Sequence, residues 1–432
     1  MAMDRNERQK SFPARTLVIL LLGGVVLIET ALLVYQIPAV NERLAWRILE
    51  VQAEVRNYLF PHADILPTAD PSQVAMMQAT LTAAKSGGST PTVTPTALAE
   101  SELPTVTPTE TPAWPPPPVQ LTLAFDKWVK QNWNNCAAAN LTMMLSFWGW
   151  PGTQVDSGSV LKPYWDDKNV MPYELERYVL DYTEYGIAVR TGGTLDDLRR
   201  LIAGGFPVMI EKGFDVQDRD LGWMGHYLFL NGYDDAQGIV ISQDSYLGAN
   251  TPVAYEALVY DWRAFNFVYL VAYPWERQDE VLARLGPNAD LEANRLATMN
   301  LAQEEAQTLE GQSQAFAYFN LGSIHVARLE YVDAAFAFDM ARSLGLPWRF
   351  LWYQTGPYFA YYYSGRYQDV IDLANETLDH QAHLEESWYW RGMARMQLGD
   401  RQGAVDDWRS ALKWHPGFPP ALEQLTALGE IA

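Results

Sequence analysis

The single cysteine of this chain stands in a context that favours a reactive thiolate. Cys136 follows the segment QNWNN, which begins with Gln131, and opens the stretch CAAANLTMMLSFWGW, which is predicted to be helical. At the N-terminus of a helix, the macrodipole and the backbone N–H groups stabilise a thiolate and lower its pKa. The same N–H groups, together with the side-chain amide of Gln131, can stabilise the oxyanion that forms when a thiolate attacks a carbonyl carbon. Such a nucleophile also requires a general base.

The candidate base is His226, since it is the only histidine between 119 and 275. It begins the segment HYLFLNGYDDAQGIVISQD, which is typical of two antiparallel strands joined by a tight turn. A turn centred at residue 235 would pair His226 directly with Asp244. A carboxylate at that position can accept a hydrogen bond from the imidazole and fix its tautomer. The pattern therefore predicts Cys136 as nucleophile, His226 as base and Asp244 as the orienting acid.

These residues lie in a mixed segment, 119–287, that contains both helical and strand patterns. Besides the helix at Cys136, the stretches MPYELERYVLDYTEY and TLDDLRRLIAGG are predicted to be helical. Apolar runs bounded by turn residues predict strands in FPVMIEKG, GHYLFLNGYDD, GIVISQDS and FVYLVAYP. One early helix followed by a sheet favours an α+β domain over an alternating parallel fold.

The motifs also resemble a known family. A Gln, then Asn-Cys opening a helix that ends in FWGW, then GHY, GYDD and a strand ending in Asp-Ser-Tyr, are similar to the double-glycine leader (bacteriocin-processing) peptidases. The similarity is greatest to their bacterial papain-fold relatives that lack the transporter, and it covers about 119–275. The resemblance implies a papain-like fold with Cys136 as nucleophile, His226 as base, Asp244 as orienter and Gln131 in the oxyanion hole.

One departure from that family leaves other functions open. The family usually has Gly-Pro after the cysteine, whereas this chain has Ala137 and Ala138. A catalytically inactive papain-fold surface adaptor is therefore one alternative. Another is a thiol amidase or transferase that acts on cell-wall peptides with the same triad.

The N-terminal part of the chain has the features of a membrane anchor. Residues 16–37 are an apolar run, and a helix of that length spans about 33 Å, which matches the hydrocarbon core. Basic residues are concentrated in 1–15, which predicts that this segment is cytoplasmic and that the remainder of the chain is extracytoplasmic. A cleaved signal peptide is the competing interpretation.

Two further segments separate this anchor from the mixed domain. Residues 38–60 have apolar side chains at spacings of three and four, which predicts an amphipathic helix. Residues 61–118 are rich in Thr and Pro, so they cannot bury enough apolar surface to fold and are expected to form a disordered linker.

The C-terminal part, 288–432, has helical patterns throughout and a repeat of roughly 34 residues, which resembles the tetratricopeptide (TPR) repeat. In the last copy, Trp388, Gly392, Ala404 and Trp408 stand at characteristic TPR positions. We expect an all-α solenoid whose groove binds a protein partner.

Net charge and composition limit the classes of ligand and partner that we expect this chain to bind. The net charge of −21 disfavours a nucleic-acid role, because phosphate binding requires clustered basic residues. We expect no metal and no cofactor, since the histidines lack metal-ligand spacing. The sequence as a whole predicts a membrane-anchored, extracytoplasmic cysteine-peptidase-like hydrolase of peptide or amide bonds.

Overall fold

A computed structural model describes residues 65–66, 68–69, 115–162, 170–215 and 222–430. The predicted cytoplasmic segment 1–15, membrane span 16–37 and amphipathic helix 38–60 lie outside these residues, as does most of the linker 61–118. Among the described residues, no helix has both the length and the apolar character that crossing a membrane requires.

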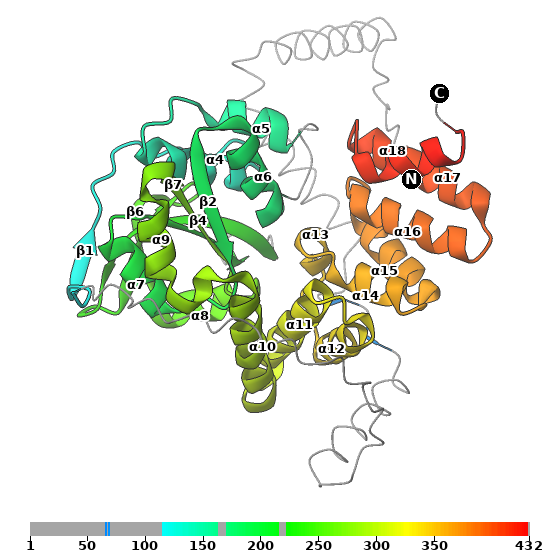
Figure 1. Ribbon diagram of the computed structural model, residues 1–432. Helices are drawn as coiled ribbons and strands as arrows, with labels where there is room; N and C mark the ends of the chain where they lie inside the picture. Colours follow the sequence, from blue (N-terminus) through cyan, green and yellow to red (C-terminus); the bar gives the residue numbers. More distant parts are fainter. Residues whose placement is uncertain (1–64, 67, 70–114, 163–169, 216–221, 431–432) are drawn as a thin grey trace, which may run out of the picture. The chain divides into compact units, whose positions relative to one another are not determined.

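An antiparallel sheet forms the centre of the first folded region (Figure 1). Its order is β2-β7-β3-β4-β5-β6, with β1 paired to β4, and every described ladder is antiparallel. The strands are β1 (Gln120–Thr122), β2 (Tyr185–Arg190), β3 (Val208–Asp215), β4 (Trp223–Asp234), β5 (Ile239–Asp244), β6 (Gly248–Ala254) and β7 (Tyr269–Pro274).

Successive side chains of the sheet enter two different apolar cores, as the pleat of a strand requires. On β4, Tyr227 and Phe229 enter one core, whereas Leu228 and Leu230 enter the other. The first core is completed by α4 (Cys136–Phe147), α5 (Gln154–Leu161) and α6 (Pro172–Tyr182). The second is completed by α7 (Leu195–Ala203), α8 (Tyr255–Arg263) and α9 (Gln278–Leu285). This arrangement confirms the predicted α+β class.

Several elements of this region carry weak sequence signals and were not predicted. Helix α5 has the sequence QVDSGSVL, which combines Gly with β-branched residues of low helix propensity. It is held instead by a capping box, in which Asp156 accepts from the Thr153 backbone N–H at 2.8 Å and Val155 N–H donates to Thr153 Oγ1 at 3.2 Å. Strand β6, GANTPVA, has no apolar alternation and lies at the edge of the sheet.

The second region consists of helices. They are α10 (Leu291–Thr308), α11 (Gly311–Ala327), α12 (Tyr331–Leu344), α13 (Phe350–Tyr353), α14 (Gly356–Tyr363), α15 (Tyr367–His380), α16 (Glu385–Gln397), α17 (Arg401–Trp414) and α18 (Pro419–Ala427). Gly322 of α11 lies against the ring of Phe338, and Gly392 of α16 lies against Trp408. A Cβ at either glycine would approach these rings to 2.7 Å, so both helix pairs depend on glycine for their close contact. Assignment of these helices to TPR repeats stays a prediction.

The two regions share an apolar core. Phe265 and Val268, which precede β7, are buried in the same cluster as Phe316 of α11 and Phe350 of α13. Trp223, the first residue of β4, stacks on Phe265 and on Phe350 with ring centroids 5.8 Å and 5.1 Å apart. The last strand ends at Pro274, and helices follow one another across the predicted boundary at 287/288. The apolar packing joins the two regions as well.

Candidate active site

Cys136 is the first residue of α4 and is half-buried. The residue before it, Asn135, makes no side-chain cap to this helix. Its amide instead donates to the side-chain oxygen of Gln154 at 3.0 Å and to the Gln154 carbonyl at 3.3 Å. The start of α4 therefore presents backbone N–H groups without a capping side chain, next to the thiol, as a helix N-terminal nucleophile requires.

His226 lies near the start of β4 and is 3% exposed. Its Nε2 is 3.1 Å from Oδ1 of Asp244, the last residue of β5, and its ring stacks on Phe214 with centroids 4.8 Å apart. The same carboxylate oxygen accepts the backbone N–H groups of Tyr246 at 2.7 Å and Leu247 at 3.0 Å. The imidazole also hydrogen-bonds Cys136. These contacts connect the thiol, the imidazole and the carboxylate in one chain.

The strand register differs from the one predicted. The turn occupies 235–238, and after a register shift in the β4–β5 ladder Phe229 pairs with Gln243. Continuing this register by one residue places Asp244 opposite residue 228, so the predicted direct pairing of His226 with Asp244 is wrong. The side chains meet diagonally instead, which neighbours on one face of a sheet can do.

The electrostatics of these groups favour an ion pair. Burial opposes ionisation of Cys136, but the hydrogen bond and charge of His226 outweigh it, so the pKa of the thiol lies below its usual value. Burial also opposes the charged form of His226, and the charge and hydrogen bond of Asp244 overcome this and raise the pKa of His226 to about 9. The pKa of Asp244 falls to about 2 against the opposing effect of burial, because His226 and the Tyr246 and Leu247 N–H groups stabilise the carboxylate. These shifts all favour the charged forms, a thiolate and an imidazolium beside a carboxylate.

Gln131 is fixed by a residue that the sequence analysis did not identify. Its backbone N–H donates to the Ser245 carbonyl at 2.9 Å, and the Ser245 hydroxyl donates to Gln131 Oε1 at 2.8 Å. Because the oxygen of the amide accepts this bond, the amide nitrogen is left as the donor end of the side chain. The bond from Ser245 therefore fixes which end of the Gln131 amide can donate a hydrogen bond.

Asn140 hydrogen-bonds several of the surrounding elements, and the sequence analysis did not identify it either. It is fully buried, and its Nδ2 lies 2.9 Å from the Cys136 carbonyl, the Tyr227 carbonyl and the Ser245 hydroxyl. These contacts join α4, β4 and the end of β5. The available signal was a polar residue one helical turn after the cysteine, inside an otherwise apolar helix.

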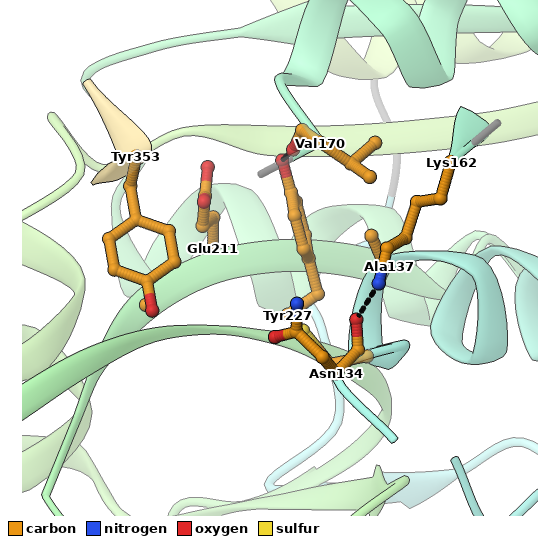
Figure 2. A pocket seen from close by; sticks show the side chains of 9 residues that line it. Asn134, Ala137, Lys162, Val170, Glu211, Tyr227 and Tyr353 are labelled. Atoms are coloured by element: carbon orange, nitrogen blue, oxygen red, sulfur yellow. Dashed lines mark hydrogen bonds between the residues drawn. The ribbon is translucent and has the colours of Figure 1, made fainter. Parts of the chain in front are cut away.

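A small pocket opens beside the thiol (Figure 2). Its interior is about 20 Å³, which is room for roughly one water molecule. Ala137 contributes to the wall, so one of the two residues that depart from Gly-Pro faces this space. The Lys162 side chain donates to the Asn134 carbonyl, and its charge further lowers the pKa of Cys136. The lining residues are Asn134, Cys136, Ala137, Lys162, Val170, Glu211, Gly225, Tyr227 and Tyr353.

Comparison with known proteins agrees with this geometry. Residues 120–270 match the model of the Peptidase_C39 like family. This segment is therefore similar to the C39-like peptidase family and is called the C39-like domain below. The C39-like domain found this way covers nearly the same residues as the family resemblance read from the sequence, and it is followed by the helical region.

One solved structure shows a weak similarity to the chain. A crystal structure of a candidate C39-like peptidase from Bacillus anthracis is similar to the chain with a TM-score of 0.28 and 15% identity, over 35% of this chain and 94% of that protein. No curated protein matches the chain.

Proposed function

We propose that the C39-like domain is a cysteine peptidase that hydrolyses peptide or amide bonds. The Cys136 thiolate attacks the carbonyl carbon, and Gln131 Nε2 with the first N–H groups of α4 stabilises the resulting oxyanion. The C–N bond then breaks as His226 donates its proton to the leaving amine. Water, deprotonated by His226, hydrolyses the thioester and releases the thiolate, while Asp244 holds the imidazole.

The observation that carries this proposal is the chain of contacts from Cys136 through His226 to Asp244. It supplies a nucleophile whose pKa is lowered and an imidazole that can protonate the leaving group. Neighbouring Ala137 and Ala138 are 4% and 0% exposed and pack within α4, so the departure from Gly-Pro is accommodated by the helix that carries the thiol.

Alkylation of the full chain by iodoacetamide tests this proposal, because Cys136 is its only thiol. The rate should show an inflection well below the ordinary thiol value of about 8.5. His226→Ala should move that inflection upward, and Cys136→Ser should abolish labelling. A rate that rises only above about pH 8 and is unchanged in His226→Ala would favour the inactive surface adaptor.

Product analysis separates hydrolase from transferase. The same triad can pass the acyl group to an amine in place of water, as a thiol transferase acting on cell-wall peptides would. Incubation with a peptide substrate in the presence of excess glycinamide should give the free acid from a hydrolase. Accumulation of the glycinamide adduct as the main product would identify a transferase.

We further propose that 16–37 anchors the chain and that the C39-like and helical regions are extracytoplasmic. The basic residues before an apolar run of membrane-spanning length support this proposal. Protease added to intact cells should release a fragment that begins within 61–118, because an extended Thr/Pro-rich backbone is unprotected. Cleavage only after lysis would place both regions inside.

The helical region, 288–432, is proposed to bind a protein partner or substrate as a TPR solenoid. Tyr363 of α14 is 53% exposed, whereas its neighbours Tyr361 and Tyr362 are buried. Tyr363→Ala should raise KM for a protein substrate and leave iodoacetamide labelling of Cys136 unchanged. An unchanged KM would argue against recognition through this surface.

A further inference from the structure

One residue of the helical region lines the pocket beside Cys136. Tyr353 is the last residue of α13, and every other lining residue comes from the C39-like region. In Figure 2 its ring lies on one side of Glu211, and Tyr227 lies on the other. The wall of this pocket is therefore built by two parts of the chain that are far apart in sequence.

The position of the Tyr353 ring is determined by contact with the strand that carries His226. The Gly225 N–H donates a hydrogen bond to the Tyr353 hydroxyl. A Cβ added to Gly225 would come within 2.8 Å of both the Tyr353 ring and the Phe265 ring, so this approach requires glycine. Tyr353 thus packs directly against the residue that precedes the proposed base.

The helix that carries Tyr353 is itself held in the shared core. Phe350 stacks between Trp223 and Phe316, with ring centroids 5.1 Å and 5.5 Å away. The side chain of Gln354 donates to the Ala264 carbonyl at 2.8 Å. Since Phe350 is completely buried, Tyr353 is supported by a packed core.

The remaining walls leave little room for adjustment. Tyr227, opposite Tyr353, is buried, and its hydroxyl donates to the Val170 carbonyl at 2.8 Å. Glu211, between the two rings, is 3% exposed and hydrogen-bonds Tyr227. The Tyr353 ring therefore closes one side of the pocket, where a bulky acyl group would contact it.

We infer that Tyr353 is a specificity-determining residue of the C39-like domain, and that its ring limits the size of the acyl group that can sit beside Cys136. The helical region thus completes the substrate pocket as well as providing a surface for partners. This inference rests on the proposed function, because it concerns the acyl group that the Cys136 thiolate attacks.

Acylation of Cys136 in the full chain by two p-nitrophenyl esters tests the inference. The acetyl ester presents a small acyl group and the phenylacetyl ester a large one, and release of p-nitrophenol reports both rates. Tyr353→Ala should raise the phenylacetyl-to-acetyl rate ratio about tenfold or more, which is the range for relieving a steric limit in a pocket. Tyr353→Phe, which keeps the ring, should retain the wild-type ratio. Leu398→Ala, at a residue that is 55% exposed, should retain it as well.

A second variant, Tyr353→Leu, and iodoacetamide labelling distinguish a steric role of Tyr353 from a structural one. Tyr353→Leu preserves an apolar contact with Phe265 and should give an intermediate ratio, which provides a result if Tyr353→Ala does not fold. An unchanged ratio in Tyr353→Ala or Tyr353→Leu, with normal iodoacetamide labelling, would overturn the inference. An equal loss of both ester rates and of iodoacetamide labelling would also overturn it, by showing a purely structural role. Failure of the proposed function appears separately, as a wild-type thiol with an ordinary pKa.

Discussion

His226 Nε2 lies 3.1 Å from Asp244 Oδ1, although the two residues are not cross-strand partners. Both side chains are almost completely buried, at 4% and 3% exposed. A buried carboxylate is expensive unless hydrogen bonds satisfy it, and here two backbone N–H groups and the imidazole do so. The Asp244 carboxylate is therefore a fixed negative charge that stabilises the protonated form of His226.

Replacing Asp244 with Asn should change the pH dependence of turnover in a defined direction. The charge of Asp244 raises the pKa of His226 to about 9, so its removal lets this pKa fall toward the ordinary value of about 6.5. Because the protonated imidazole is needed for the leaving amine, the alkaline limb of the kcat/KM profile should move to lower pH. The value at neutral pH should fall by a factor of about 10² to 10⁴.

A pH series of kcat/KM on wild type and Asp244→Asn measures this shift. Asp234→Asn is the matched control, since Asp234 accepts hydrogen bonds only within the β4–β5 turn. An alkaline limb that stays near pH 9 in Asp244→Asn would contradict the assigned role.

Ser245→Ala should slow acyl transfer without affecting the thiolate. The substitution removes the donor that orients Gln131, so the oxyanion loses stabilisation, and kcat should fall about 10-fold to 100-fold. Iodoacetamide alkylation forms no oxyanion and should keep its wild-type rate. Ser242→Ala removes an equally buried hydroxyl from β5, bonded only to the Thr251 carbonyl, and should leave kcat unchanged. Equal effects of the two substitutions would indicate a general loss of stability.

Glu211→Gln tests whether the acid in the pocket is neutral. Burial raises the pKa of Glu211 well above its usual range, which favours the neutral carboxyl. An amide of similar shape would replace that neutral form without a change in charge. The pH inflection of Cys136 alkylation should therefore be the same in the variant. If Glu211 were ionised, its removal would relieve repulsion of the thiolate and move the inflection to lower pH.

Phe350→Ala should destabilise the C39-like and helical regions together. Phe350 is completely buried between Trp223 and Phe316, and truncating such a ring costs about 3–5 kcal/mol of unfolding free energy. Thermal unfolding followed by circular dichroism and by Cys136 accessibility should shift to one lower midpoint. Leu398→Ala, at a residue 55% exposed, should change stability by less than about 0.5 kcal/mol. Separate midpoints for the two probes would show that the regions unfold independently.

Local patterns in the sequence were sufficient for much of the fold. The apolar runs over β3, β4, β5 and β7 and the periodic stretches at α6 and α7 were correctly interpreted, because each is long and bounded by turn residues. Strand β2 and helix α8 were not predicted. The β4–β5 register could not be predicted correctly from the sequence, because it depends on the turn length and on a shift within the ladder.

In the candidate site, too, some features follow from local sequence and others only from tertiary packing. The sequence alone predicted Cys136 and His226 as candidates, since each is the only residue of its type in the domain. The structure places them at a helix start and in a strand, as the patterns predicted. Only the tertiary structure revealed Ser245 as the partner of Gln131 and Tyr353 as a wall of the pocket. Those contacts join residues more than a hundred positions apart in the chain. Propensity and periodicity act over a few residues, whereas such contacts follow from how two faces of a sheet and a second helical region pack.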